Sequence, residues 1–223
     1  MQKITDREKL KKYLELPAVR RYFSRDLDEF FQLVSSRPGE QIIFQGVKSD
    51  YLYFLLFGRC KVSAVMENGR TVIVNSLAAP CLVGEIELIN QDVPFSVEIL
   101  TEAQLLALPV AVCRQRLLSS PDFLLQLCCD LVGKERTNAI KLAHYISFPL
   151  ENRLAQFILN NSSEDGLRIK KTVIAESLGV SYRHLEKVMN DLVAKGVLSK
   201  SGKQYRIIRR PYLQQLADAM EVF

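Results

Sequence analysis

Basic and hydrogen-bonding side chains follow one another between Ser181 and Lys187. Arg183 and Lys187 are four residues apart, so in a helix they would lie on the same face. An arginine guanidinium can pair with the O6 and N7 atoms of guanine, and a lysine can reach guanine or a phosphate. Tyr182 could contact a thymine methyl group or a phosphate, or only pack within the protein. This is the chemistry of a helix that reads base edges in DNA.

The residues around this stretch predict two short helices joined by a tight turn and followed by a β-hairpin, over residues 167–208. Gly179 suits the turn because glycine tolerates a positive φ, and Ser181 is the expected N-cap of the second helix. Lys200 and Lys203 fall in the hairpin, where contacts to phosphates would position the protein without specifying a sequence. Apolar residues recur at helical spacing on both sides of the turn: Val173, Ile174, Leu178, Leu185, Val188, Met189 and Leu192.

Positive charge is concentrated in the same region. Residues 168–210 contain eleven Lys or Arg and three Asp or Glu, a local net charge of +8, whereas the whole chain carries only +5. A basic patch of this kind attracts phosphates. The alternative is a helical pair kept for packing alone, which would explain the helices but not the concentration of charge.

Composition sets the outer limits. The chain has 223 residues, of which 48% are hydrophobic, enough for two domains or one large one. No apolar run approaches the roughly 18 residues of a membrane span, and residues 1–17 lack the apolar core of a signal peptide. The cysteines are odd in number and show no C-x-x-C spacing, which argues against a disulfide framework. We therefore expect a cytoplasmic protein that does not associate with membranes.

The first half of the chain predicts helices followed by a small β-domain. Residues 1–34 alternate apolar and charged residues at helical spacing, and Pro17 should interrupt the first helix. Between Arg37 and Pro109, glycine-containing turns separate six to eight short apolar or β-branched runs, which favours a small barrel or jelly roll. Asn68-Gly69 predicts a hairpin, since this dipeptide favours the primed turns.

A long helical region is predicted from Val110 to about Tyr145. Ser120 and Pro121 should begin its second helix after a break, and residues 147–149 should form a hinge because the residue before proline avoids helical geometry. One apolar track keeps to a 3–4 alternation, with Glu135 as its one interruption: Leu125, Cys128, Val132, Ala139, Leu142 and Ile146. A second track beside it is formed by Leu124, Leu127 and Leu131. Two tracks could face the β-domain and a partner helix, although burial within one protomer is the alternative. We favour a homodimer, with an interface that includes Leu125, Cys128, Val132, Ala139 and Leu142.

The order of these elements, and four sequence blocks, resemble the cyclic-AMP receptor and FNR (Crp/Fnr) family of bacterial transcription regulators over nearly the whole chain. The blocks are RPGEQIIFQG, LVGEIELI, SPDFLLQL and LGVSYRHLEKVM. Within the family the chain is most similar to the YeiL-like regulators, in APCLVGEIELI, SFPLENRLAQFIL and LGVSYRHL.

The resemblance implies an α+β fold in three parts. These are a cyclic-nucleotide-binding-like β-barrel domain (1–118), a long dimerisation helix (119–146) and a winged helix-turn-helix domain (147–223). It implies a homodimer that binds double-stranded DNA through Tyr182, Arg183 and Lys187, with Ser181 near the backbone. RNA polymerase is a candidate partner, and the effector, a small molecule or a redox signal, is not identified.

The effector site departs from the pattern of cyclic-nucleotide binders. Those proteins place a Gly-Glu pair and then an Arg-Ser or Arg-Thr pair about ten residues later. Gly84 and Glu85 match the first pair, but Phe95 and Ser96 stand at the second, so the arginine is missing. Asn138 and Ala139 stand where cyclic AMP would meet the dimer helices, and the Ala139 side chain offers no hydrogen bond. A buried phosphate without a charged partner is costly, so we expect no response to cyclic AMP. Gly84, Glu85, Phe95, Ser96 and Asn138 remain the candidate effector pocket, and Glu85 could instead only tie down a turn.

Other classes of site are disfavoured by residue type. An FNR-type iron–sulfur cluster needs cysteines near the N-terminus, and none precedes Cys60. A cupin-type oxygenase needs two histidines in the barrel, whereas His144 and His184 lie outside it. We therefore expect no enzyme activity, metal or cofactor. The remaining alternative is a cyclic-nucleotide-like sensor or cupin-like barrel protein without a DNA-binding role, which the basic helical pair disfavours.

Overall fold

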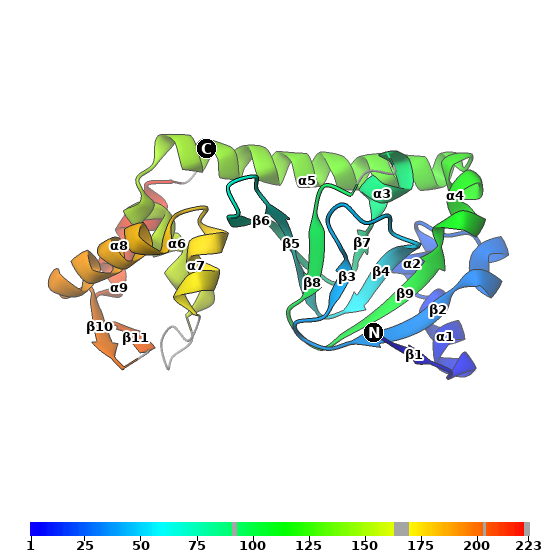
Figure 1. Cartoon of the computed structure of the whole chain (residues 1–223), viewed down its shortest axis with the longest axis horizontal. Helices are drawn as coiled ribbons and strands as arrows, with labels where there is room; N and C mark the ends of the chain where they lie inside the picture. Colours follow the sequence, from blue (N-terminus) through cyan, green and yellow to red (C-terminus); the bar gives the residue numbers. More distant parts are fainter. Residues whose placement is uncertain (91–92, 163–169, 203, 221–223) are drawn as a thin grey trace. The chain divides into compact units, whose positions relative to one another are not determined.

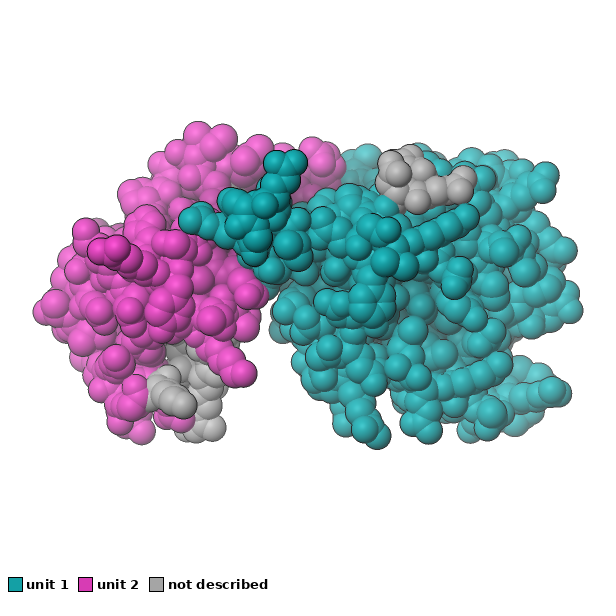
Figure 2. Space-filling model, in the orientation of Figure 1, with its two compact units in different colours: residues 1–133 teal, residues 134–223 magenta. Residues whose placement is uncertain are grey.

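The computed structural model describes residues 1–90, 93–162, 170–202 and 204–220 of the chain. These residues form two compact units, Met1–Gly133 and Lys134–Phe223 (Figure 2). The first unit contains two antiparallel sheets and the second is largely helical (Figure 1). The fold is thus a β-sheet domain followed by a helix-turn-helix domain, which confirms the predicted α+β class.

The sheets of the first unit enclose an apolar interior. The five-stranded sheet has the order β1 (Gln2–Ile4), β2 (Gln32–Ser36), β9 (Ala103–Pro109), β4 (Tyr51–Phe57), β7 (Cys81–Val83). The four-stranded sheet has the order β3 (Gln41–Ile43), β8 (Ser96–Ile99), β5 (Arg59–Val65), β6 (Thr71–Ala78). One buried cluster draws side chains from both sheets, as a jelly roll requires: Ile43, Tyr53, Leu55, Cys60, Val97, Ile99 and Leu105.

The middle of strand β4, residues 52–56, is buried on both faces, which accounts for its continuous run of apolar and aromatic residues. Tyr53 and Leu55 point into the interior between the sheets, whereas Leu52 and Phe54 belong to a second cluster on the opposite face. That second cluster includes side chains from α1 (Arg7–Leu14), α2 (Pro17–Arg20), α4 (Val110–Leu118) and α5 (Pro121–Ser147). Helices therefore cover the outer face of the five-stranded sheet.

The prediction that residues 1–34 form only short helices is wrong in part. Helices α1 and α2 and the 3-10 helix η1 (Arg25–Phe30) are present, and Pro17 begins α2. However, β1 and most of β2 also fall in this segment. Strand β2 pairs with β9 from Gln32↔Ala107 to Ser36↔Ala103, and β1 pairs with β2. Strand β2 depends on a partner about 70 residues away and β1 on one about 30 residues away, so local periodicity could not reveal them.

The hairpin at Asn68-Gly69 is confirmed, but its turn differs from the primed type that we expected. Strands β5 and β6 pair up to Val65↔Thr71. The Gly69 N–H donates to the Met66 carbonyl across 2.8 Å, and Gly69 has φ +73°. A four-residue turn that ends in a left-handed glycine is the longer hairpin loop with a bulge. A glycine is needed at either kind of turn, which is why the dipeptide alone could not distinguish them.

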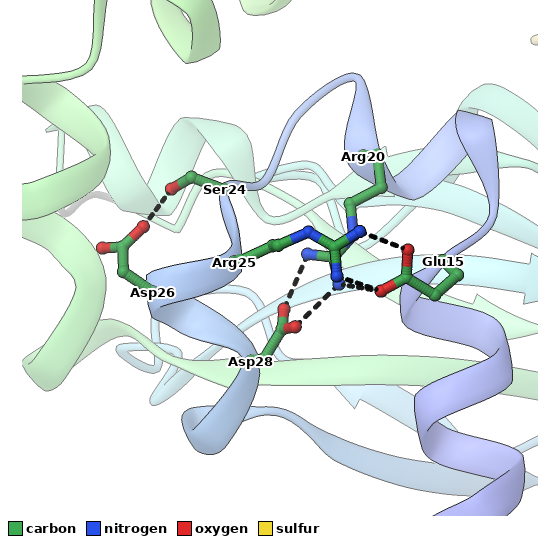
Figure 3. Close-up of polar contacts among 6 residues, drawn as sticks. All are labelled: Glu15, Arg20, Ser24, Arg25, Asp26 and Asp28. Atoms are coloured by element: carbon green, nitrogen blue, oxygen red, sulfur yellow. Dashed lines mark hydrogen bonds and ion pairs between the residues drawn. The ribbon is translucent and has the colours of Figure 1, made fainter.

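Ion pairs hold the N-terminal helices together, as Figure 3 shows. The Arg20 guanidinium donates to both carboxylate oxygens of Asp28 at 2.7 Å and to Glu15 at 3.0 Å. Arg25 makes a second bidentate contact with Glu15, at 2.7 and 2.8 Å. Ser24, just before η1, donates to Asp26 in its first turn. This network joins the end of α1 to α2 and η1.

Helix α5 begins as predicted. The Ser120 Oγ accepts the Phe123 N–H at 3.3 Å, and Pro121 is the first residue of the helix. Phe123 and Leu127 are buried in the cluster on the outer face of the sheet, and the Tyr22 hydroxyl donates to Asp130. Helix α5 ends at Ser147, and α6 begins at Leu150 directly after Pro149.

The second unit is a winged helix-turn-helix. Its elements are α6 (Leu150–Asn161), α7 (Lys171–Ser177), α8 (Tyr182–Ala194), β10 (Leu198–Ser201), β11 (Gln204–Ile207) and α9 (Arg210–Asp218) (Figure 1). Strands β10 and β11 form the antiparallel hairpin that serves as the wing. A single buried cluster unites these elements and includes Leu154, Ile158, Ile174, Leu185, Met189, Tyr205 and Leu213.

Candidate nucleic-acid interface

Helix α8 buries one face and exposes the other. Leu185, Met189 and Leu192 have no exposed surface and lie in the core of the second unit. The Ser181 Oγ accepts the His184 N–H at 3.2 Å, so the predicted N-cap is present. The side chains on the outward face line an open concavity: Ser181, Arg183, His184, Glu186, Lys187, Asn190 and Asp191.

The turn before α8 is shaped by Gly179, which has φ +62°. The Val180 N–H donates to the Ala175 carbonyl at 3.0 Å, which closes the end of α7. A Cβ on residue 179 would lie 3.5 Å from the ring of Tyr145, in addition to the strain of the left-handed conformation. The turn therefore requires glycine for its backbone angle, whereas a Cβ would make only an ordinary van der Waals contact with Tyr145.

The structure brings most of the predicted DNA-contact residues to exposed positions of the second unit. Arg183 and Lys187 are exposed on successive turns of α8. Tyr182 is also exposed, and Lys200 is exposed on β10 of the wing. Lys203 lies outside the described residues.

One residue of this surface was missed by the sequence analysis. Lys171 is the first residue of α7, and its Nζ lies 2.8 Å from a carboxylate oxygen of Glu186 on α8. The same ammonium lies 5.6 Å from the ring centre of Tyr182. The spacing of Tyr182 and Glu186 places them on one face of a helix, but nothing local in the sequence links either of them to Lys171.

The candidate effector residues of the first unit lie just before and at the start of α3 and β8. Gly84 has φ +98°, and a Cβ there would lie 3.4 Å from the Tyr51 carbonyl oxygen. Glu85 is buried at the start of α3 (Glu85–Asn90) and interacts within the protein. The Ser96 Oγ already accepts the Gln45 N–H at 3.0 Å, and Phe95 is half-buried. Asn138, on α5, belongs to the second unit.

An apolar stripe of α5 is exposed. Val132 is 69% exposed, and the residues that share its 3–4 spacing are exposed as well: Leu125, Cys128, Ala139, Leu142 and Ile146. Of the second predicted track, Leu127 is buried and Leu124 half-buried, whereas Leu131 is exposed. The stripe keeps the spacing of a coiled-coil seam.

The cysteines and histidines do not assemble into a metal centre within the described part of the chain, where no group of three or more His, Cys, Asp or Glu could hold an ion. Cys60 and Cys113 are buried, and burial raises the pKa of the Cys113 thiol to about 11. Cys113 is thus a small apolar packing residue at neutral pH. Cys128 and Cys129 are exposed on α5.

Comparisons with known proteins agree with this architecture. Residues 33–120 match the cyclic nucleotide-binding domain, and residues 152–216 match the Crp-like helix-turn-helix domain. The regulatory protein YeiL of Escherichia coli O157:H7 is 40% identical over 200 residues, which span 89% of this chain and 91% of that protein. The chain belongs to the Crp/Fnr family of transcriptional regulators. Its resemblance to the YeiL-like members is confirmed by the same match.

More distant relatives show the same organisation. The cAMP-activated global transcriptional regulator CRP of Escherichia coli O157:H7 is 24% identical over 73% of this chain and 82% of its own length. A Crp/Fnr-family regulator from Eubacterium rectale has a similar fold, with a TM-score of 0.75, 14% identity and coverage of 94% of this chain and 97% of that one. One from Thermus thermophilus has a TM-score of 0.71 at 22% identity, over 85% of this chain and 100% of its own.

Within the described residues, no helix combines the length and the apolar character that a membrane crossing requires.

Proposed function

We propose that this regulator binds inverted-repeat DNA sites as a homodimer in the cytoplasm, by binding alone and without a catalytic step. One observation carries the proposal. Arg183 and Lys187 are exposed together on a capped helix whose other face is buried in the core. In a winged helix-turn-helix, such a helix enters the major groove. Arg183 and Lys187 would then reach base edges, and Tyr182 and Ser181 would lie beside them.

The wing supports the same mode of binding. Lys200 is exposed on β10, at a register position opposite Tyr205 of β11. A lysine on an exposed hairpin beside a recognition helix can contact phosphates, which adds affinity without selecting a sequence. We propose this role for Lys200, and also for Lys203 on the grounds of its sequence position.

The proposed dimer uses the exposed stripe of α5. An isolated helix that exposes Leu125, Val132 and Leu142 leaves apolar surface in water, and a second copy of the helix would remove it. Cys128, Glu135 and Ala139 stand at the intervening positions of the 3–4 pattern, and Glu135 is its one interruption. Two helix-turn-helix units held in this way would bind half-sites about one helical turn of DNA apart.

We further propose that the β-domain does not respond to cyclic AMP, although the relative CRP is named as cAMP-activated. Phe95 stands where a cyclic-nucleotide binder needs an arginine, and its side chain cannot offset the charge of a phosphate. A different effector would have to use other chemistry at Gly84, Ser96 or Asn138.

Selection of bound DNA from a random library by the purified full-length chain tests the proposed function. The expected product is a two-fold symmetric site, bound at two protomers per duplex and more tightly than random DNA. Enrichment of no sequence, or of a site bound by one protomer, would contradict it.

A further inference from the structure

Lys171 connects three elements of the DNA-binding unit. Its ammonium pairs with Glu186 at 2.8 Å and lies 5.6 Å from the ring centre of Tyr182, both on α8. It also lies 5.7 Å from the ring centre of Tyr205, a buried residue of the wing strand β11. Tyr182 and Glu186 stand one turn apart on the same face of α8, so one ammonium can contact both. Lys171 thus joins α7, the recognition helix and the wing.

The positive charge of Lys171 interacts with other groups of the protein. The Lys171 side chain is only 17% exposed, whereas that of Glu186 is 42% exposed. A lysine that serves as a phosphate contact is normally an exposed point charge. Here the ammonium is already occupied by a carboxylate and two aromatic rings, which attract cations through their faces.

The Glu186 carboxylate is the group whose charge Lys171 compensates. It lines the outward concavity of α8 beside Arg183 and Lys187. An uncompensated carboxylate there would repel the phosphates of a bound duplex. The hydrogen bond from Lys171 holds the pKa of Glu186 below its ordinary value, and the pKa of Lys171 is raised by the same contact. Both groups therefore remain charged, and therefore paired, at neutral pH.

We propose that Lys171 is a positioning residue for sequence recognition: it neutralises Glu186 and fixes Tyr182, so that α8 presents Arg183 and Lys187 to the bases in one arrangement. This inference rests on the proposed DNA binding. It assigns Lys171 a function that acts through Glu186 and Tyr182, and not through a contact with DNA.

The experiment compares the variants Lys171→Met, Lys171→Arg and Glu186→Gln with the double variant Lys171→Met/Glu186→Gln. Each is titrated by fluorescence anisotropy against the selected site and against random DNA at several salt concentrations. Lys195→Met is the matched control, because Lys195 forms a Lys–Glu pair in the same unit with Glu151, at 2.6 Å. The wild-type titration comes first and tests the proposed function by itself.

We expect Lys171→Met to weaken binding to the selected site by about tenfold, with a smaller effect on random DNA, because the freed Glu186 carboxylate would pair with Arg183, three residues earlier on α8, and compete with its contact to a base. The double variant should recover most of that loss, and Lys171→Arg should stay within about threefold of wild type because a guanidinium can also pair with a carboxylate. Lys195→Met should preserve the ratio between specific and random binding.

Three results would overturn the inference. Lys171→Met could lose affinity equally on both DNAs, with a salt slope smaller by about one, which would indicate a direct phosphate contact. Glu186→Gln could fail to rescue the Lys171 variant, or Lys171→Met could bind the selected site as wild type does.

A measurement without DNA covers the case in which the variants fold poorly. Titration of the Glu186 carboxyl by NMR in the wild-type protein should give a pKa below that of an unpaired glutamate. An ordinary value would overturn the inference even if the wild-type protein binds DNA as proposed. Failure of the wild-type protein to bind any DNA would overturn the proposed function and this inference with it, whereas a failure confined to the variants would leave the proposed function standing.

Discussion

The Tyr145 hydroxyl donates a hydrogen bond to the Ser177 carbonyl oxygen across 3.0 Å, and so joins the end of α5 to the C-terminal end of α7. The Arg153 guanidinium lies 4.2 Å from the ring centre of Tyr145 and donates to the Leu178 carbonyl at 3.1 Å. Carbonyls at the end of a helix lack partners within the helix, so these two side chains supply them. The turn at Gly179 is thus held by two residues that lie outside α7 and α8.

Tyr145→Phe should weaken the end of α7. The change removes one hydrogen bond and keeps the ring on which Arg153 stacks, so the expected loss of local stability is about 0.5–1.5 kcal/mol. Amide hydrogen exchange at Val180, whose N–H bonds to the Ala175 carbonyl, measures that opening. Exchange should quicken at Val180 while the core of the β-domain keeps its protection. An unchanged rate at Val180 would show that the bond to Ser177 does not hold the turn.

Val132→Asp should dissociate the proposed dimer without unfolding the protomer. Val132 is 69% exposed, so the protomer loses little packing, whereas the dimer seam would have to bury two unpaired carboxylates. We expect the dimer dissociation constant to rise by about a hundredfold, which corresponds to roughly 2.8 kcal/mol. Sedimentation velocity over a range of concentrations measures it. Val112→Asp, at an exposed position of α4, is the control, and an equal effect of both changes would count against the seam on α5.

Protonation of the Glu40 carboxylate should lower the stability of the β-domain in acid. The Ser36 hydroxyl donates to its carboxylate at 2.6 Å and the Arg37 N–H at 3.1 Å, and these bonds lower the pKa of Glu40 from 4.5 to about 2. A pKa that is lower in the folded state contributes stability above the ordinary value, and that contribution is lost as pH falls from about 4.5 to about 2. Urea unfolding at a series of pH values should therefore show a smaller decline for Glu40→Gln than for wild type in this window. Parallel declines would contradict the assignment.

Cyclic AMP should not stabilise the protein. A ligand that binds only the folded state raises the Tm as its concentration increases. Because Phe95 replaces the arginine that a cyclic phosphate requires, we expect the Tm to be independent of cyclic AMP concentration. The cAMP-activated CRP is a positive control for the assay. A saturable rise in Tm for this chain would show that other residues accept the phosphate.

Features determined by neighbouring residues were predictable from sequence. Ser181 caps α8, Gly179 makes the turn, and Leu185 and Met189 face the core, because each depends on residues within one or two helical turns. The break before α5 at Ser120 was predictable for the same reason.

Features that depend on distant partners were not predictable. Strand β2 requires β9, so residues 32–34 were predicted to be helical although they belong to β2. Lys171 lies 15 residues from Glu186, and only the crossing of α7 and α8 brings the two together. The apolar stripe on α5 was predictable only in part. Its spacing was visible in the sequence, but only the structure distinguishes Leu127, which is buried against the β-domain, from Val132, which is exposed.

The most direct test of base reading by α8 is a titration of Arg183→Ala against the selected site and random DNA. A bidentate arginine–guanine contact contributes about 1–3 kcal/mol of discrimination, so specific binding should weaken by roughly five- to 150-fold. Preference should relax at one base pair of each half-site, and binding to random DNA should change much less. Equal losses on the specific site and on random DNA would contradict the claim that Arg183 reads a base.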